Sequence, residues 1–143
     1  GTVATGALHE HSAPAAAKDP AGGWVDTMPG HADAAVLARG EQRFGIFCGP
    51  CHGAQADGKG MLFQRAQVQS ANLMEQRFRD MPAGQLFDEM TNGVGLMPAY
   101  GPFVPVADRW AILAYLRKLQ AETPVPESAA GAARTPACVK ARR

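Results

Sequence analysis

Three stretches of the chain place apolar residues at helical spacing, and no stretch alternates apolar and polar residues as a β-strand does. The first predicted helix follows Asp33, a suitable N-cap, and runs through residues 34–47. The second covers residues 83–90, with Pro82 suited to its first turn. The third covers residues 106–120, and its apolar positions span too wide an arc for a surface helix. The pattern therefore predicts an all-α domain whose last helix is largely buried.

Charged residues mark the ends of the third predicted helix. Asp108 stands in its first turn, and Arg117 and Lys118 stand in its last turn, so that the charges complement the helix dipole. Other arginines are isolated charges, and such residues more often face water than bind a ligand. We therefore expect three of them to be solvated: Arg65, Arg77 and Arg79.

The sequence divides into one folded domain and two irregular flanks. Residues 1–32 are rich in Ala, Gly, Pro and His and predict an extended N-terminal arm, of which residues 24–29 are expected to pack on the domain. The folded domain is predicted for residues 33–122. Residues 123–143 hold several prolines and a basic end, which predicts an irregular, solvated tail in which Cys138 is a free thiol.

Length, charge and hydropathy narrow the classes of protein to which the chain can belong. The 143 residues suffice for one domain with tails, and a formal net charge of +1 gives no general reason to expect a nucleic acid or an anionic membrane as partner. The sequence contains no run of about 18 or more apolar residues, so it predicts no transmembrane span. It also contains no signal-peptide pattern of a basic start and an apolar centre.

The chemistry-bearing residues gather in one motif, in which Cys48, Cys51 and His52 have the spacing C-x-x-C-H. This spacing is the attachment signature of a c-type haem. Two thiols three positions apart can add to the two vinyl groups on one edge of a porphyrin. The adjacent imidazole then falls on one face of the ring, within bonding reach of the iron. The motif predicts one haem c, covalently bound through Cys48 and Cys51, with His52 as an axial ligand.

Two other kinds of site share part of this motif. Cys-Gly-Pro-Cys is also the dithiol of thioredoxin-like oxidoreductases, but these place it after a strand within βαβ units, whereas residues 34–47 are predicted to be helical. Structural zinc needs four ligands, and the remaining cysteine and histidines lie in tail-like sequence: Cys138, His9, His11 and His31. The sequence therefore disfavours both alternatives.

The sixth coordination position of the iron needs a second ligand, and a Met in that position suits electron transfer. Met97 precedes Pro98 in a glycine-rich loop, from which a thioether can reach the face of the ring opposite His52. We predict Met97 as this ligand. Met61 and Met81 are lesser candidates, and a site that is open or bound by a second His is a further alternative. Met90 is expected in the core.

These features together resemble a class I cytochrome c. The resemblance rests on residues spread over the domain: Gly40 and Phe44, the motif Cys48, Cys51 and His52, Met97 and Pro98, and residues 110–116. It implies three main helices around one covalently bound haem, with extended N- and C-terminal tails. It also implies that the first and last helices cross, with Gly40 and Phe44 packed against Ile112 and Tyr115.

Further segments resemble the monohaem cytochrome c subunit of alternative complex III, a membrane-bound quinol:electron-acceptor oxidoreductase of bacterial respiratory chains. They are residues 1–4, 25–29, 39–44, 58–61 and 108–112. This resemblance implies partners among the other subunits of a membrane respiratory complex or a terminal oxidase. It implies a place on the periplasmic side of the bacterial inner membrane, attached through those partners or through a lipid anchor outside this numbering. Because covalent haem attachment points to an exported protein, we interpret the chain as mature or trimmed at its start.

We expect a single-electron carrier rather than an enzyme, with no small-molecule substrate. His52 is expected to donate its other ring N–H to a backbone carbonyl, which fixes the tautomer. The haem-free chain is expected to be unfolded or molten, because three short helices bury little surface by themselves. The alternatives are a free periplasmic shuttle or a cytochrome domain that delivers electrons to a terminal oxidase, a haem protein with an open site for a small ligand, and a dithiol oxidoreductase that uses Cys48 and Cys51.

Overall fold

The computed structural model describes residues 17–125 of the chain. This part of the chain forms six helices and no strand: α1 Ala34–Phe47, α2 Gly49–His52, α3 Met61–Ala66, α4 Gln76–Arg79, α5 Ala83–Asn92 and α6 Val106–Glu122. The predicted all-α fold is confirmed. The short helices α2, α3 and α4 were not predicted, because four to six residues are too few to show helical periodicity. Cys138 and most of the predicted tails lie outside the described residues.

The three longer helices begin where the sequence predicted. Asp33 caps α1, and its carboxylate accepts a hydrogen bond from the backbone N–H of Val36 at 2.9 Å. Pro82 is the N-cap of α5 rather than a residue of its first turn. Helix α6 continues two residues beyond the prediction, to Glu122. None of the helices in the described part of the chain is long and apolar enough to cross a membrane.

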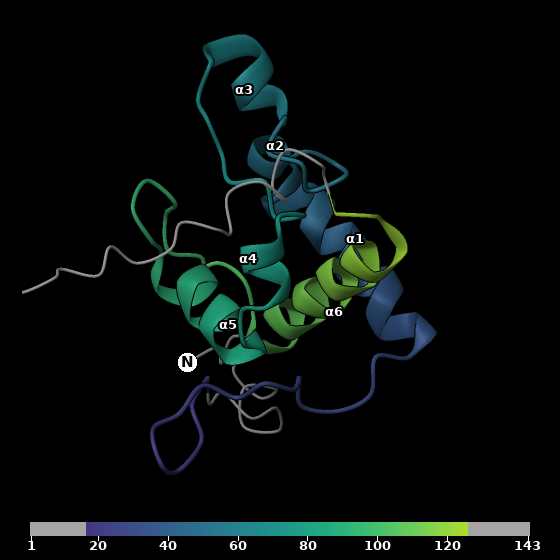
Figure 1. Cartoon of the computed structure of the whole chain (residues 1–143), viewed down its shortest axis with the longest axis vertical. Coiled ribbons are helices and arrows are strands. Elements are labelled where there is room, and N and C mark those ends of the chain that lie inside the picture. The colour runs from purple at the N-terminus through teal and green to yellow at the C-terminus, as the bar shows by residue number, and fades with distance from the viewer. Residues whose placement is uncertain (1–16, 126–143) are drawn as a thin grey trace, which may run out of the picture.

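Helices α1 and α6 cross and form the main helix–helix contact of the domain (Figure 1). Gly40 is buried at the crossing, and a Cβ at this position would meet the carbonyl of Ala111 and the Cβ of Tyr115. Phe44, one turn later, is 2% exposed, and its ring centroid lies 5.6 Å from that of Tyr115. The predicted contact with Tyr115 is confirmed. The close partner of Gly40 is Ala111 rather than Ile112, which is buried in the core beside it.

The charged residues of α6 make contacts that the sequence did not predict. Asp108 lies in the first turn, but its buried carboxylate accepts from Nε and Nη2 of Arg39 at 2.8 and 2.9 Å and forms an ion pair with Arg43 at 3.1 Å. Asp108 therefore joins α6 to α1. Arg117 and Lys118 do not lie in the last turn, because the helix is longer than predicted. The side chain of Arg117 instead binds backbone carbonyls of the chain that leads into α5.

Helix α5 also packs on α6. The rings of Phe87 and Trp110 stack with centroids 4.2 Å apart and planes at 15°. Most residues of α6 are buried, which confirms that its wide apolar arc marks a core helix. In Figure 1, α3 stands apart from this core, and none of its residues is buried.

The segment that precedes α1 packs on α5. The backbone N–H of Val25 donates to the carbonyl of Ala17 at 3.2 Å, and that of Gly84 donates to the carbonyl of Val25 at 2.8 Å. Val25 and Met28 contact the core. Figure 1 shows this segment passing below α5 on its way to α1. The expected packing of residues 24–29 is confirmed at Val25 and Met28, and it extends back to residue 17.

Candidate functional site

The C-x-x-C-H motif lies at the junction of α1 and α2. Cys48 is both the C-cap of α1 and the N-cap of α2. The backbone N–H groups of Cys51 and His52 both donate to the carbonyl of Cys48, at 3.1 and 2.8 Å. Residues three apart on a helical turn lie on the same side, so the turn presents the two cysteine side chains together. That arrangement is the one that two thioether bonds to one porphyrin edge require.

A loop folds back over the end of α2. The backbone N–H of Gly58 donates to the carbonyl of His52 at 2.8 Å, and that of Gly60 donates to the carbonyl of Cys51 at 3.2 Å. Carbonyls at the end of a helix have no partner within the helix, and this loop supplies one to each. The loop therefore holds the second half of the motif in place.

His52 is 9% exposed, and its Nδ1 lies 2.9 Å from the carbonyl oxygen of Ala71. Because a carbonyl only accepts, Nδ1 carries the proton and Nε2 keeps its lone pair for a metal. The predicted hydrogen bond from His52 to a backbone carbonyl is confirmed. Its acceptor, Ala71, lies in the loop between α3 and α4 and was not identified from the sequence.

The surroundings of the two cysteines do not suit a redox-active dithiol. No disulfide joins Cys48 and Cys51. Burial, and then the neighbouring Cys51, raise the pKa of the Cys48 thiol to about 12. A reactive dithiol depends on a lowered thiol pKa, so the environment of Cys48 acts in the opposite sense. A zinc site also finds no support within residues 17–125, where no three His, Cys, Asp or Glu side chains gather as metal ligands.

Met97 lies in the loop between α5 and α6. Val94 and Met97 exchange both backbone hydrogen bonds, at 3.1 and 2.9 Å, and close a tight turn. Gly95 in this turn has a φ of 57°, in the left-handed region that favours glycine. The backbone N–H of Tyr100 donates to the carbonyl of Met90 at 3.0 Å, which ties the loop to α5. Met97 itself is half-buried against the core.

Tyr100 brings the Met97 loop next to the motif. Its ring centroid lies 6.4 Å from that of Phe47, with the planes at 70°, and Phe47 directly precedes Cys48. Burial, and then the nearby sulfurs of Cys51 and Cys48, raise the pKa of the Tyr100 hydroxyl. The two segments that carry the predicted axial ligands therefore lie side by side.

The other methionines occupy different positions. Met90 and Met74 are 5% and 3% exposed within the core, and the core position of Met90 was predicted. Met61 is 51% exposed at the start of α3. Met81 is half-buried and contacts the core where the chain leads into α5.

Arg109 fixes both ends of the Met97 loop and was not predicted. It is 5% exposed. Its Nε donates to the carbonyl of Val104 at 3.0 Å, and its Nη1 donates to the hydroxyl of Thr91. Thr91 precedes the loop and Val104 closes it. The signal that could have identified Arg109 was its place, as a cationic residue, within the apolar arc of a helix predicted to be buried.

Arg79 is partly buried and binds backbone carbonyls, so the prediction that it simply faces water was wrong. Its Nε donates to the carbonyl of Met74 at 2.8 Å, and its Nη2 donates to the carbonyl of Thr123 at 2.7 Å, just beyond α6. Arg77 remains exposed and pairs with Glu75 at 2.9 Å. The difference arises because the end of α6 supplies acceptors to Arg79, and its position cannot be read from the local sequence.

A buried histidine with a free Nε2, two cysteines on one helical turn and a methionine loop beside them fit a haem, and they define a c-type cytochrome domain. The family model described as "Cytochrome C oxidase, cbb3-type, subunit III" matches residues 35–116, and the chain belongs to this family. Its cofactor is therefore haem c, bound covalently through Cys48 and Cys51, and its activity is electron transfer.

A solved structure agrees with this fold. Cytochrome CL from the marine methylotrophic bacterium Methylophaga aminisulfidivorans is 19% identical, with a TM-score of 0.50 over 82% of this chain and 67% of that chain. This likeness supports the class I cytochrome c fold. A chain of the reducing HAO-like protein complex of Kuenenia stuttgartiensis is 17% identical, with a TM-score of 0.46 over 67% of this chain and 49% of that chain. A search of curated proteins gave no match.

Proposed function

We propose that this domain carries single electrons through a haem whose iron is bound by His52 on one face and Met97 on the other. The observation that carries the proposal is the contact between Phe47 and Tyr100, at 6.4 Å between ring centroids. Phe47 adjoins the motif and Tyr100 belongs to the Met97 loop, so this contact holds together the segments that bear the two ligands. The exposed position of Met61 and the core positions of Met74 and Met90 leave those residues less suited to the role.

Haem c supplies a one-electron ferric–ferrous couple when bound. Cys48 and Cys51 would tether the group, and the carbonyl of Ala71 orients the ring of His52 and leaves Nε2 available to bind the iron. Met97 offers a soft thioether, a ligand type that raises the reduction potential. Both ligands are held by backbone hydrogen bonds of their own segments, so they keep their places when the oxidation state changes.

The test of the ligand pair is a carbon monoxide challenge of the ferrous holoprotein. The unsubstituted protein is expected to resist carbon monoxide, because the thioether occupies the sixth position. Met97→Ala is expected to bind carbon monoxide at once, and the control Met61→Ala is expected to behave like the unsubstituted protein. Immediate binding by the unsubstituted protein would contradict the proposal and indicate an open site. Opening of the site in Met61→Ala instead would assign the ligand to Met61.

We further propose that, in the cell, this domain lies on the periplasmic side of the bacterial inner membrane, as the cytochrome subunit of a quinol-oxidising respiratory complex. The sequence resemblance to the cytochrome subunit of alternative complex III supports this role. So do exposed apolar side chains in the Met97 loop and on α3: Leu96 at 96%, Phe103 at 73%, Met61 at 51% and Leu62 at 42%. A free shuttle relies on charge to steer its encounters, and the net charge here is only +1.

Native electrophoresis of detergent-solubilised membranes from the source bacterium tests this role. An antibody to the chain and a haem stain are expected to mark one band at the mass of a complex, and added quinol is expected to reduce the haem in that band. The purified chain is the control, and quinol alone is not expected to reduce it. Recovery of the chain at its own mass in the periplasmic fraction would contradict the role of fixed subunit and indicate a shuttle.

A further inference from the structure

The side-chain amide of Gln120 is buried, and both its nitrogen and its oxygen have a hydrogen-bond partner. It lies on α6 and is 4% exposed. Its Nε2 donates to the carbonyl of Leu73 at 2.7 Å, and its Oε1 accepts from Nη1 of Arg117 at 2.8 Å. Only this orientation of the amide suits both partners, because a carbonyl only accepts and a guanidinium only donates. Such a satisfied buried group favours one arrangement of the segments it joins.

The segment that Gln120 holds is the one that orients His52. Leu73 lies two residues beyond Ala71, whose carbonyl oxygen is 2.9 Å from Nδ1 of His52. On its other side, the backbone N–H of Leu73 donates to the carbonyl of Ala56 at 2.8 Å. The acceptor of the His52 hydrogen bond is therefore fixed between the loop that follows the motif and the last helix.

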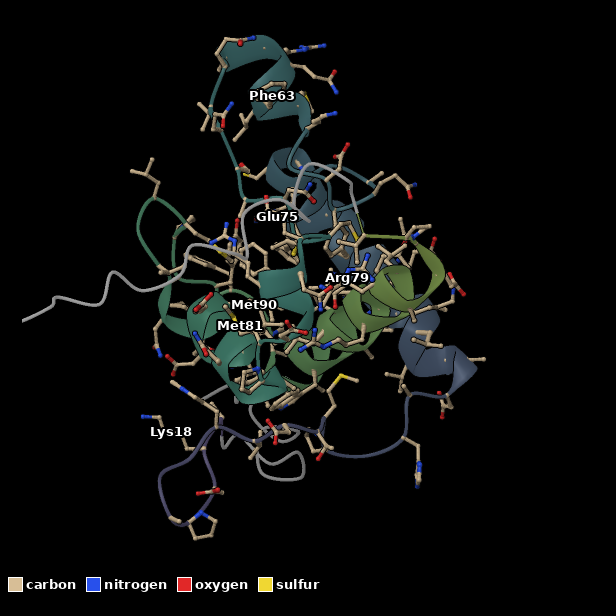
Figure 2. The ribbon with its side chains drawn as sticks, in the orientation of Figure 1. Lys18, Phe63, Glu75, Arg79, Met81 and Met90 are labelled. Atoms are coloured by element: carbon tan, nitrogen blue, oxygen red, sulfur yellow. The ribbon has the colours of Figure 1, made fainter. Side chains whose placement is uncertain are left out.

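Arg79 ties the same segment to the end of α6. It donates to the carbonyl of Met74, the residue after Leu73, and to that of Thr123, the residue after α6. Figure 2 shows Arg79 beside α6. The last carbonyls of a helix need partners from outside it, so this contact is favourable for α6 as well. Two side chains, those of Gln120 and Arg79, thus join residues 73 and 74 to the end of α6. The hydrogen bond made by Gln120 is the one nearer to Ala71.

We propose that Gln120 is a positioning residue for His52. By holding the carbonyl of Leu73, it keeps the carbonyl of Ala71 where the imidazole N–H donates to it, and so sets how strongly His52 donates to the iron. This assignment rests on the proposed function, because it requires His52 to be the axial ligand.

Three variants separate positioning from stability. Gln120→Glu keeps the length of the side chain and an acceptor for Arg117, but an ionised carboxylate cannot donate to Leu73. Leu119→Ala removes a neighbouring side chain of α6 that is 9% exposed and has no part in these hydrogen bonds, so it lowers stability alone. Gln120→Met fills similar space without burying a charge, and it replaces Gln120→Glu if that variant does not fold.

Proton NMR of the ferrous holoprotein and a redox titration provide the readouts. In Gln120→Glu, exchange of the His52 ring N–H with solvent is expected to accelerate about tenfold, the factor for one lost hydrogen bond. The reduction potential is expected to rise, because the imidazole becomes a weaker donor. Leu119→Ala is expected to melt at a lower temperature with both quantities unchanged.

Two results overturn the assignment in distinguishable ways. If the haem-bound His52 signals are present and Gln120→Glu leaves both the exchange rate and the potential at their original values, the positioning role is wrong and the proposed function stands. If the unsubstituted protein shows no haem-bound His52 signals, the proposed function is wrong and the assignment falls with it.

Discussion

Gly40 of α1 lies directly against the backbone of Ala111 of α6. A Cβ at position 40 would stand 2.0 Å from the carbonyl oxygen of Ala111 and 2.7 Å from its carbonyl carbon. These atoms belong to the helix backbone and cannot turn aside as a flexible side chain does. The crossing of α1, which leads into the motif, with α6, which supplies much of the core, therefore depends on the absence of a side chain at Gly40.

Gly40→Ala is expected to lower the free energy of unfolding by about 3 kcal/mol or more, because the added methyl group meets backbone in a packed interface. Gly45→Ala is the matched control on the same helix, since nothing lies within 4 Å of a Cβ at that position. The control is expected to raise the free energy of unfolding by about 0.5–1 kcal/mol, the usual gain from Gly to Ala in a helix. Denaturant titration of both holoproteins measures the difference. If Gly40→Ala and Gly45→Ala were equally stable, α1 and α6 would not pack in this way.

Asp108 is expected to stabilise the same crossing through its contacts with Arg39 and Arg43. Asp108→Asn removes the charge from a carboxylate that is 10% exposed. Because the side chain of Arg39 is 45% exposed and can turn to water, we expect a loss of only about 1–2 kcal/mol, smaller at high salt. Denaturant titration at low and high ionic strength checks the size and the salt dependence. Glu122→Gln, which removes an exposed ion pair of the same helix, is the control and is expected to have no measurable effect. A loss that does not change with salt would contradict an electrostatic origin.

Arg109 is expected to hold the Met97 loop in place. Arg109→Lys keeps the charge but lacks the planar fork that reaches both Thr91 and Val104. We expect a loss of about 1–2 kcal/mol in stability and a weaker ferric thioether–iron charge-transfer band, because the loop opens more often. Arg77→Lys is the matched control, since the side chain of Arg77 is 64% exposed on α4. Identical spectra for the two variants would show that Arg109 does not restrain the ligand loop.

The haem-free chain is expected to lack fixed tertiary packing. Leu96, Phe103 and Val94 of the Met97 loop are 96%, 73% and 51% exposed, so the loop buries little apolar surface against the protein itself. Cys48→Ser combined with Cys51→Ser, produced without haem, is expected to keep helical far-UV circular dichroism, lose its near-UV signal and bind the dye ANS. A cooperative thermal transition equal to that of the holoprotein would contradict this expectation.

The parts of the fold that could be predicted from the sequence each depend on residues that lie close together in the chain. The helix before the motif begins at Asp33, whose side chain caps its own first turn. The motif at Cys48, Cys51 and His52 is complete within five positions. The wide apolar arc of α6 depends on the residues of one helix alone. In each of these cases the physical cause and the visible pattern lie in the same short segment.

The features that the sequence did not predict depend on residues far apart in the chain. The acceptor of the His52 hydrogen bond is a backbone carbonyl, which every residue has, so nothing in the side chain of Ala71 marks its role. Arg79 was expected in water because one of its acceptors, the carbonyl of Thr123 just beyond α6, lies forty-four residues away in the chain. The amide nitrogen of Gln120 has an acceptor only because α6 passes the loop that contains Leu73. Sequence patterns could predict the helices and the motif but not these contacts between them.

We propose above all that this domain holds one covalent haem with histidine and methionine ligation. The most direct test is an absorption spectrum of the purified holoprotein, oxidised and dithionite-reduced, together with a pyridine haemochrome assay. We predict the haemochrome of a c-type haem and a ferric methionine–iron charge-transfer band that disappears in Met97→Ala. A c-type haem without that band would contradict the assignment of Met97. The absence of covalent haem from protein matured in a competent host would contradict the account as a whole.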